Sequence, residues 1–341
     1  MNSTVSKMQA ARALCAAATL AAVTASGLAL LGLSSPAMAQ ADYPNRPVKI
    51  IVPFPPGGPS DTLARMVAER LSEAWKQPVV VDNRPGAGGN IGLGIAAKAP
   101  ADGYTFAQVA TSTFAVNPNL YKNLPFDAEK DFVPVALLTR IANVLLVNPE
   151  VPAKNLAELL ALMKSKPGGL NGGYPGAGNS AHIALVMLER AAGAETTRVP
   201  YKGDADGMSA LMGGQVQVYF TVSFVAAPQI KAGKVRAIAI AAPARSPGLP
   251  EVPTFAEAGL PNFMDTTAWF GLATNAGVPA AIVRKTNEEV NRALATPKVR
   301  DYLLRIGATP GSGSAEEFAE FARAERARWG RAVQESGVKV E

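Results

Sequence analysis

Short apolar runs alternate with amphipathic helical patterns along most of this chain, and this alternation constrains the fold more than any other feature. The run Val48–Val52 has strand length, and the following segment, Ser60–Lys76, carries apolar residues at helical spacing. Similar apolar runs recur at 79–81, 104–110, 197–200, 216–220 and 237–241. Because strands that alternate with helices are typical of α/β proteins, the sequence predicts an α/β fold with mostly parallel sheets.

Two longer extended segments indicate how the chain is divided. Val133–Leu138 together with Val144–Val147 forms the first, and Trp269–Ala273 forms the second. If each passes between two bodies, the chain crosses over twice, and the two bodies can hinge about a shared cleft. We therefore expect a first domain at 42–142 plus 270–341 and a second domain at 143–269.

Residues 1–39 have the pattern of a secretory signal peptide. Lys7 and Arg12 supply positive charge without any acidic residue, Leu14–Leu33 is apolar, and Ala37-Met-Ala39 fits a small-x-small cleavage site. A membrane anchor is the alternative, but glycine and proline interrupt the apolar run and no basic cluster follows it. We expect cleavage before Gln40 and a mature protein that is free in the periplasm.

Charge and cysteine content narrow the function classes. Removal of Lys7 and Arg12 lowers the formal net charge from +6 to +4, and the remaining basic residues are dispersed. This pattern suits an acidic small molecule and argues against a nucleic-acid partner. The only cysteine, Cys15, lies within the signal segment, so the mature chain has no disulfide, no thiolate metal site and no cysteine nucleophile.

Two glycine-rich turns stand immediately before predicted helices. Pro55-Pro-Gly57-Gly58 precedes the helix that opens at Ser60, and Gly176-Ala-Gly-Asn-Ser180 precedes a helix over Ser180–Ala192. The first N–H groups of a helix have no partner within it, and the helix dipole adds positive charge there. Two such N-termini, one in each domain, could hold a carboxylate between them. An ordinary tight turn is the alternative interpretation of each.

A third glycine-rich segment, Gly86–Gly92, loosely resembles a dinucleotide-binding fingerprint. Its glycine spacing differs from the fingerprint, and no acidic residue stands about 20 residues further on, where the partner of the ribose is expected. The sequence also lacks a phosphate-binding loop that ends in Gly-Lys-Ser or Gly-Lys-Thr. We therefore expect these glycines to serve turns and packing, with no cofactor bound.

His182 is the only histidine, and it follows Ser180 closely at the start of the second of these helices. One histidine cannot build a multi-histidine metal site, so no metal is expected. A secreted serine hydrolase that uses Ser180 and His182 is the alternative function, although no nucleophile-elbow motif is present. We favour a structural or binding role for His182, and a role for Asp61 in stabilising the first helix turn.

Several short motifs follow one another in order along the chain. They are Ile50-Ile-Val-Pro-Phe-Pro-Pro-Gly-Gly58 with Asp61 and Arg65, Asn83-Arg-Pro-Gly-Ala-Gly-Gly-Asn90, Asp102-Gly-Tyr-Thr105, Pro200-Tyr-Lys-Gly203, Gly213-Gly-Gln215, Lys231-Ala-Gly-Lys234 and Val252-Pro-Thr-Phe-Ala-Glu-Ala-Gly259. Together they resemble the Bug-type periplasmic solute receptors, the substrate-binding proteins of tripartite tricarboxylate transporters. Each motif is weak alone, but the ordered set is specific and spans essentially the whole mature chain.

The resemblance implies a two-domain periplasmic-binding-protein (Venus-flytrap) fold with a hinge of two crossover strands. Such a receptor closes on a small carboxylate without catalysis, acts as a monomer, and delivers its ligand to a membrane permease or to a sensor protein. The resemblance also implies ligand-binding residues in loops of both domains. They are Phe54, Gly57, Gly58, Asp61, Thr111, Ser112 and Thr113 on one side, and Gly178, Asn179, Ser180, His182, Tyr201, Gly203 and Asp204 on the other.

Two departures from the family pattern bear on the ligand. Thr221 stands where relatives often carry aspartate, and Phe114 stands where histidine is frequent. The first change removes a negative charge near the expected cleft, and the second makes its wall more apolar. We therefore expect a mono- or dicarboxylate without an amino group, aromatic acids included.

Overall fold

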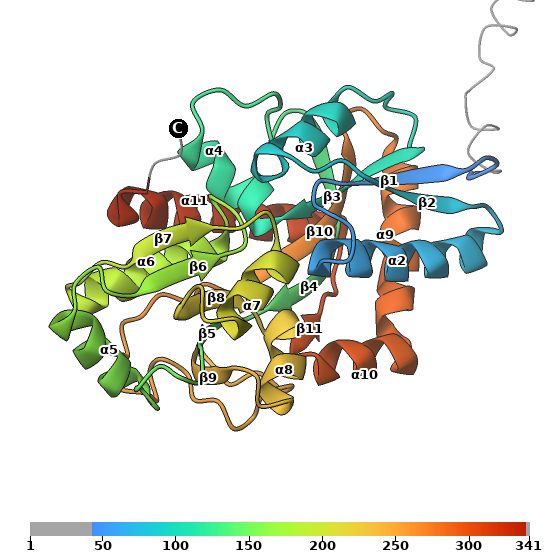
Figure 1. Ribbon diagram of the computed structural model, residues 1–341. Helices are drawn as coiled ribbons and strands as arrows, with labels where there is room; N and C mark the ends of the chain where they lie inside the picture. The colour runs from blue at the N-terminus through green and yellow to red at the C-terminus, as the bar shows by residue number, and fades with distance from the viewer. Residues whose placement is uncertain (1–42, 339–341) are drawn as a thin grey trace, which may run out of the picture. The chain divides into compact units, whose positions relative to one another are not determined.

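Two mixed β-sheets with helices packed around them form the computed structural model, which describes residues 43–338 (Figure 1). The predicted signal peptide and Cys15 lie outside the described residues. The first sheet has the strand order β11-β4-β10-β3-β1-β2, and the second has the order β7-β6-β8-β5-β9. The strands are β1 (Val48–Val52), β2 (Val79–Asn83), β3 (Thr105–Ala110), β4 (Phe132–Ile141), β5 (Asn143–Val147), β6 (Asn171–Tyr174), β7 (Thr197–Pro200), β8 (Val218–Val222), β9 (Arg236–Ala241), β10 (Ala268–Asn275) and β11 (Ala308–Pro310).

The helices follow the strands in the alternation that the sequence predicted. Two short irregular helical segments, η2 (Ala87–Gly89) and η3 (Ser112–Val116), lie between strands of the first sheet. The other helices are α2 (Pro59–Trp75), α3 (Asn90–Ala97), α4 (Asn117–Leu120), α5 (Leu156–Ser165), α6 (Ser180–Ala192), α7 (Asp204–Met212), α8 (Ser223–Lys231), α9 (Ala280–Ala295), α10 (Pro297–Arg305) and α11 (Ala315–Ser336).

The chain crosses twice between the sheets. β4 belongs to the first sheet and β5 to the second, with only Ala142 between them, and the chain returns after β9 to enter β10. The predicted α/β architecture with two crossover strands is thereby confirmed. The domain bounds 42–142 plus 270–341 and 143–269 stay a prediction.

The prediction of mostly parallel sheets is wrong for the strands next to the crossovers. β1 pairs in parallel with β2 and β3, and β6 pairs in parallel with β7 and β8. By contrast, β10 pairs antiparallel with β3 and β4, and β5 pairs antiparallel with β8 and β9. Strands joined by a helix within one sheet run parallel, whereas a strand that enters from the other sheet is free to run the opposite way.

One strand, β6, is absent from the apolar runs from which strands were predicted. β6 contains Gly172 and Gly173, which disfavour a strand by propensity. A Cβ atom on Gly173 would approach the ring of Tyr219 to 2.7 Å, and one on Gly172 would collide with the side chain of Thr196. This strand therefore depends on close tertiary packing, which the local sequence does not show. α8, α10 and β11 were also missing from the prediction.

Candidate functional site

The first helix mouth is the N-terminus of α2, which follows β1 through the turn 53–58. Gly58 is its N-cap in an extended conformation and provides no side-chain cap, and Pro59 occupies the first helical position. Proline has no N–H, and the N–H groups of Ser60 and Asp61 have no partner within the helix. This end of α2 therefore presents unpaired donors and the positive end of the helix dipole.

Asp61 holds the turn in shape. Its carboxylate accepts hydrogen bonds from Gly57 N at 2.9 Å, from Asn83 Nδ2 at 2.9 Å and from Arg65 Nε at 3.0 Å. Burial raises the pKa of Asp61, but these hydrogen bonds outweigh burial and hold the pKa below its ordinary value. The contacts agree with the expected role of Asp61 in supporting the first turn, and they leave its carboxylate turned toward the protein.

Ser60 is paired with a buried carboxamide of the neighbouring strand. Its hydroxyl donates to Oε1 of Gln108, which lies in β3, and both side chains are buried. Neither residue was among the predicted site residues. A polar residue inside the otherwise apolar run Phe106–Ala110 is the sequence signal that points to Gln108.

The second helix mouth is the N-terminus of α6, which follows β6 through the turn 175–179. Asn179 caps it, because its Oδ1 accepts a hydrogen bond from His182 N at 2.8 Å and its Nδ2 donates to Pro175 O at 2.7 Å. Gly176 and Gly178 have φ angles of +110° and +75°, which favour glycine. The cap uses the N–H of the third helical residue, so only the N–H groups of Ser180 and Ala181 remain without a helical partner.

His182 closes the same turn as a neutral ring. Gly178 N donates to His182 Nδ1 at 3.2 Å, and the ring stacks on Tyr174 with 4.2 Å between centroids. Burial, assisted by the positive charge of Arg198, lowers the pKa of His182 to about 4. Among the described residues no hydrogen bond joins His182 to the Ser180 hydroxyl, as a serine hydrolase would require.

The Ser180 hydroxyl is held instead by Asn143, the first residue of β5. Asn143 Nδ2 donates to Ser180 Oγ at 2.9 Å and also to Thr266 O in the second crossover. Asn143 and Thr266 are fully buried, and neither was predicted as a site residue. One side chain therefore connects the first crossover, the second crossover and the α6 mouth.

Three predicted site residues, Thr111, Ser112 and Thr113, follow the end of β3, and their hydroxyl groups have different contacts. Thr111 Oγ1 accepts from Trp269 N at 2.7 Å, and Thr113 Oγ1 accepts from Ala110 N at 3.1 Å. These two hydroxyls are used within the protein, whereas the Ser112 hydroxyl has no hydrogen bond to another described residue. Of the three hydroxyl groups, only that of Ser112 is therefore left without a partner in the described part of the chain.

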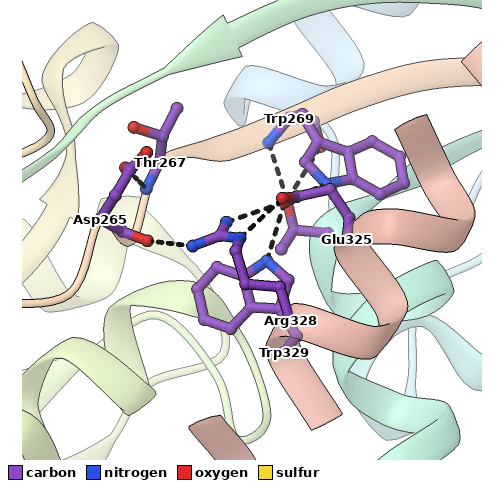
Figure 2. Close-up of polar contacts among 7 residues, drawn as sticks. Asp265, Thr267, Trp269, Glu325, Arg328 and Trp329 are labelled. Carbon is purple, nitrogen blue, oxygen red and sulfur yellow. Dashed lines mark hydrogen bonds and ion pairs between the residues drawn. The ribbon is translucent and has the colours of Figure 1, made fainter. Parts of the chain in front are cut away.

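The second crossover is anchored by the C-terminal helix (Figure 2). Glu325 Oε2 accepts hydrogen bonds from Trp269 Nε1 at 3.1 Å and from Trp329 Nε1 at 3.0 Å, and Arg328 pairs with the same carboxylate at 2.7 Å. Arg328 also donates to the backbone carbonyl of Asp265. These contacts fix residues 265–269, which contact Asn143 through Thr266 and Thr111 through Trp269.

Tyr201–Asp204 lies beside the end of β6, from which the α6 turn follows. Tyr201 N donates to Tyr174 O at 3.0 Å, and Asp204 accepts a hydrogen bond from the Thr221 hydroxyl. Burial raises the pKa of Asp204 to about 6, although the Thr221 hydrogen bond acts in the opposite direction. A carboxyl group therefore remains beside Thr221, so this substitution alone does not remove the charge from that region.

The glycine-rich loop 86–92 packs between the turns of the two sheets. A Cβ atom on Gly88 would lie 3.4 Å from Ala177 O, and one on Gly89 would lie 2.7 Å from Thr113 Cγ2 and 3.4 Å from Phe54 Cζ. A Cβ atom on Gly178 would lie 2.9 Å from Leu120 Cδ2. The loop acts in packing, as predicted, and it brings the Phe54 turn, the end of β3 and the Gly176–Gly178 turn into one region.

Residues 43–338 contain no cluster of histidine, cysteine, aspartate or glutamate that could hold a metal ion. No helix in the same range is long and apolar enough to cross a membrane.

The sequence model of the family described as "Tripartite tricarboxylate transporter family receptor" matches residues 63–338. Protein BugT of Bordetella pertussis is 35% identical over 323 residues, which cover 94% of this chain and 98% of BugT.

Two solved structures of Rhodopseudomonas palustris proteins are similar over their whole length. Rpa4515 with adipate superposes with a TM-score of 0.84 at 36% identity and covers 87% of this chain and 99% of its own. MatC with bound malate superposes with a TM-score of 0.80 at 35% identity and covers 85% of this chain and 100% of its own.

Proposed function

This chain belongs to the tripartite tricarboxylate transporter receptor family, and on that premise we propose that it captures a small carboxylate between the α2 and α6 mouths. Members of this family are periplasmic solute-binding receptors with two domains, not enzymes. The proposed bounds of the domains are 42–142 plus 270–341 and 143–269. The serine hydrolase alternative is set aside.

The pair of helix N-termini is the observation that carries the proposal. Each N-terminus follows the carboxyl end of a strand in a parallel pair, where α/β proteins bind ligands. Unpaired N–H groups and the helix dipole favour an anion without any basic side chain. The adipate bound to Rpa4515 and the malate bound to MatC support a carboxylate for this chain as well.

The proposed ligand-contacting groups lie at both mouths. Phe54, Gly57, Gly58 and Ser112 face it from the first sheet, and Gly178, Asn179, Ser180 and His182 face it from the second. Asp61, Thr111 and Thr113 shape the site through their contacts within the protein. Tyr201, Gly203 and Asp204 form the far wall.

We keep the proposal that the ligand lacks an amino group, although Asp204 acts against it. Burial raises the pKa of Asp204 to about 6, so its carboxylate is mostly ionised at neutral pH and would attract an ammonium group. The support for an acid without an amino group is the adipate bound to Rpa4515 and the malate bound to MatC. Amino acids are therefore the decisive comparison.

Closure follows from the arrangement of the two mouths. An acid that contacts both of them favours the closed state, because only that state provides both sets of donors. We propose that the protein is exported by a cleaved signal peptide, acts as a monomer, and passes its ligand to permease subunits or to a sensor. No nucleic acid takes part.

Calorimetry tests the proposal directly. The mature protein is unfolded and refolded to release co-purified acids, which are identified by mass spectrometry. It is then titrated with adipate, malate, succinate, benzoate, aspartate and glutamate. We expect binding of at least one non-amino acid of this panel, with thermal stabilisation and without turnover. Tight binding of aspartate or glutamate would contradict the amine-free ligand, and binding of no carboxylate would contradict the function.

A further inference from the structure

Each helix mouth carries the same small unit, a serine hydrogen-bonded to a buried carboxamide from another strand of the same sheet. At the α2 mouth the unit is Ser60 with Gln108, and at the α6 mouth it is Ser180 with Asn143. The two carboxamides are fully buried, although both lie in mainly apolar strands. Burial of a carboxamide is costly unless its polar atoms are paired.

Both carboxamides leave one polar atom without a hydrogen-bond partner among the described residues. These atoms are Gln108 Nε2 and Asn143 Oδ1. Asn148, which follows the other end of β5, differs because its Nδ2 donates to Leu211 O at 2.7 Å and its Oδ1 accepts from Glu150 N at 2.9 Å. Two further orphaned atoms are Asn117 Oδ1 and Tyr219 Oη. Asn117 also donates to Gly88 O at 3.2 Å, and the ring of Tyr219 packs edge-on against Tyr201.

The protons at the α6 mouth can be assigned. Thr266 O is a carbonyl oxygen and can only accept, so the nitrogen of Asn143 must face it. The same nitrogen donates to Ser180 Oγ. Ser180 Oγ therefore acts as an acceptor toward Asn143, and its own proton is directed elsewhere.

The α2 mouth has donors to spare whichever way its amide faces. Ser60 and Gln108 together carry one O–H and two N–H protons, and their mutual hydrogen bond uses only one of them. If the amide were reversed, Gln108 would donate to Ser60 and the serine proton would be left over. Both orientations leave unused protons at a helix N-terminus that already favours an anion.

We infer that Gln108 and Asn143 are positioning residues of the ligand site, which direct the unused protons at the two helix mouths toward the bound acid. Asn143 acts by orienting the Ser180 hydroxyl while its own nitrogen is held by Thr266 O. Thr266 lies in the second crossover, which Glu325 and Arg328 anchor (Figure 2). Gln108 acts through the donor that its pairing with Ser60 leaves unused. The inference rests on the proposed function, because it assigns how the same site selects an acid.

The first experiment compares the two asparagines at opposite ends of β5. Asn143→Ala and Asn148→Ala each remove a carboxamide that donates to a backbone carbonyl, so both should lower the melting temperature by similar amounts. We expect Asn143→Ala to weaken calorimetric binding of adipate and malate by up to about tenfold, because the Ser180 hydroxyl loses the partner that orients its proton toward the charged acid. Asn148→Ala should bind both acids as the wild type does.

The second experiment changes charge while keeping shape. Gln108→Glu retains an acceptor for the Ser60 hydroxyl but replaces the spare N–H group with negative charge at the α2 mouth. Gln217→Glu is the control. Gln217 lies just before β8, at the end of the second sheet away from the α6 mouth, and its side chain hydrogen-bonds Asn171 N and Gly214 O. We expect Gln108→Glu to lower affinity for adipate and malate at least tenfold, and Gln217→Glu to leave it unchanged.

The outcomes separate the inference from the function on which it rests. Equal affinities for Asn143→Ala and Asn148→Ala, or wild-type affinity for Gln108→Glu, would overturn the positioning role while the receptor function stands. A wild-type protein that binds neither these two acids nor the rest of the carboxylate panel would overturn both.

Discussion

The N-termini of α2 and α6 follow similar glycine-rich turns, yet their first N–H groups are used differently. At α2 the N-cap is a glycine without a side-chain hydrogen bond, and proline occupies the first helical position. At α6 the side chain of Asn179 caps the helix, and His182 Nδ1 takes the N–H of Gly178. The α2 mouth thus keeps its donors open, whereas the α6 mouth is stabilised by side chains that use part of them.

This difference assigns different tasks to the two mouths. An uncapped helix end gains most from an incoming anion, because its donors have no other partner. A capped end is already held in one conformation and requires little ordering when a ligand arrives. We therefore expect the α2 mouth to contribute more of the binding free energy, and the α6 mouth to contribute more to the stability of the protein.

The largest expected effect is at the α2 mouth. Gly58→Val should weaken acid binding by more than about 100-fold, equivalent to about 3 kcal/mol, because the side chain would occupy the place of the anion. The free protein should tolerate the change, since a Cβ atom there would meet only Pro55 O at 3.8 Å. Calorimetry with adipate and malate measures the loss, and the melting temperature serves as the control. Unchanged affinity would mean that the acid does not approach α2.

Acid should destabilise the α6 mouth through His182. Its pKa is about 4 in the folded protein and 6.5 in its ordinary state, so the unfolded chain binds the proton more tightly. The stability that His182 provides is therefore complete above pH 6.5 and is lost as the pH falls toward 4, by on the order of 2–3 kcal/mol.

The titration of Asp204 changes stability with pH in the opposite direction to that of His182. Asp204 must therefore be replaced before the loss of stability caused by His182 can be measured. Its pKa is raised from 3.8 to about 6, so its contribution to stability grows as the pH falls from 6 to 3.8 and is lost as the pH rises again. Denaturant unfolding of Asp204→Asn between pH 7 and pH 4.5 should show the His182 slope, and the additional change His182→Gln should remove it. A slope that persists without His182 would assign it to other groups.

Ser180→Ala should weaken adipate and malate binding about tenfold, because one hydrogen bond to a charged ligand is lost. The folded state should lose only about 1 kcal/mol, since Asn143 keeps its contact with Thr266 O. Ser165→Ala in α5 is the matched control, because its hydroxyl bonds only to Leu162 O at 2.9 Å. Equal binding by both variants would place the acid away from α6.

The smallest effect concerns the cap itself. Asn179→Ala should lower the free energy of unfolding by about 1 kcal/mol, as other N-cap removals do. Acid binding should change less than in Gly58→Val, because the freed His182 N–H partly replaces what the side chain provided. Chemical denaturation measures the loss of stability and calorimetry the loss of acid binding, both on the same samples of Asn179→Ala. A larger loss of binding than of stability would contradict the division of tasks between the mouths.

Local signals in the sequence were sufficient for helices whose ends are marked by capping and turn residues. α6 was predicted with its observed bounds, and the capping box at Ser314 and Glu317 is present. β6 was missed because its glycines are required by contacts with Tyr219 and Thr196, which lie far along the chain. Long-range packing of this kind leaves no periodic pattern in the sequence.

The candidate site shows the same limit. The glycine-rich turns were visible, because the chain must bend before a helix begins. The partners of Ser60 and Ser180 were not, since Gln108 and Asn143 reach the mouths only through the order of strands in the two sheets. The ligand contacts of the fourteen residues assigned from the resemblance stay predictions.

The contacts of Glu325 and Arg328 with the second crossover can form only late in the synthesis of the chain. All strands of the second sheet lie between residues 143 and 241, so that sheet can be completed while synthesis continues. The first sheet must wait for β10 and β11, and the Glu325–Arg328 contacts that hold the crossover come from α11, near the end of the chain. A chain that stopped short of α11 would contain both helix mouths and still lack the contacts that fix the second crossover beside them.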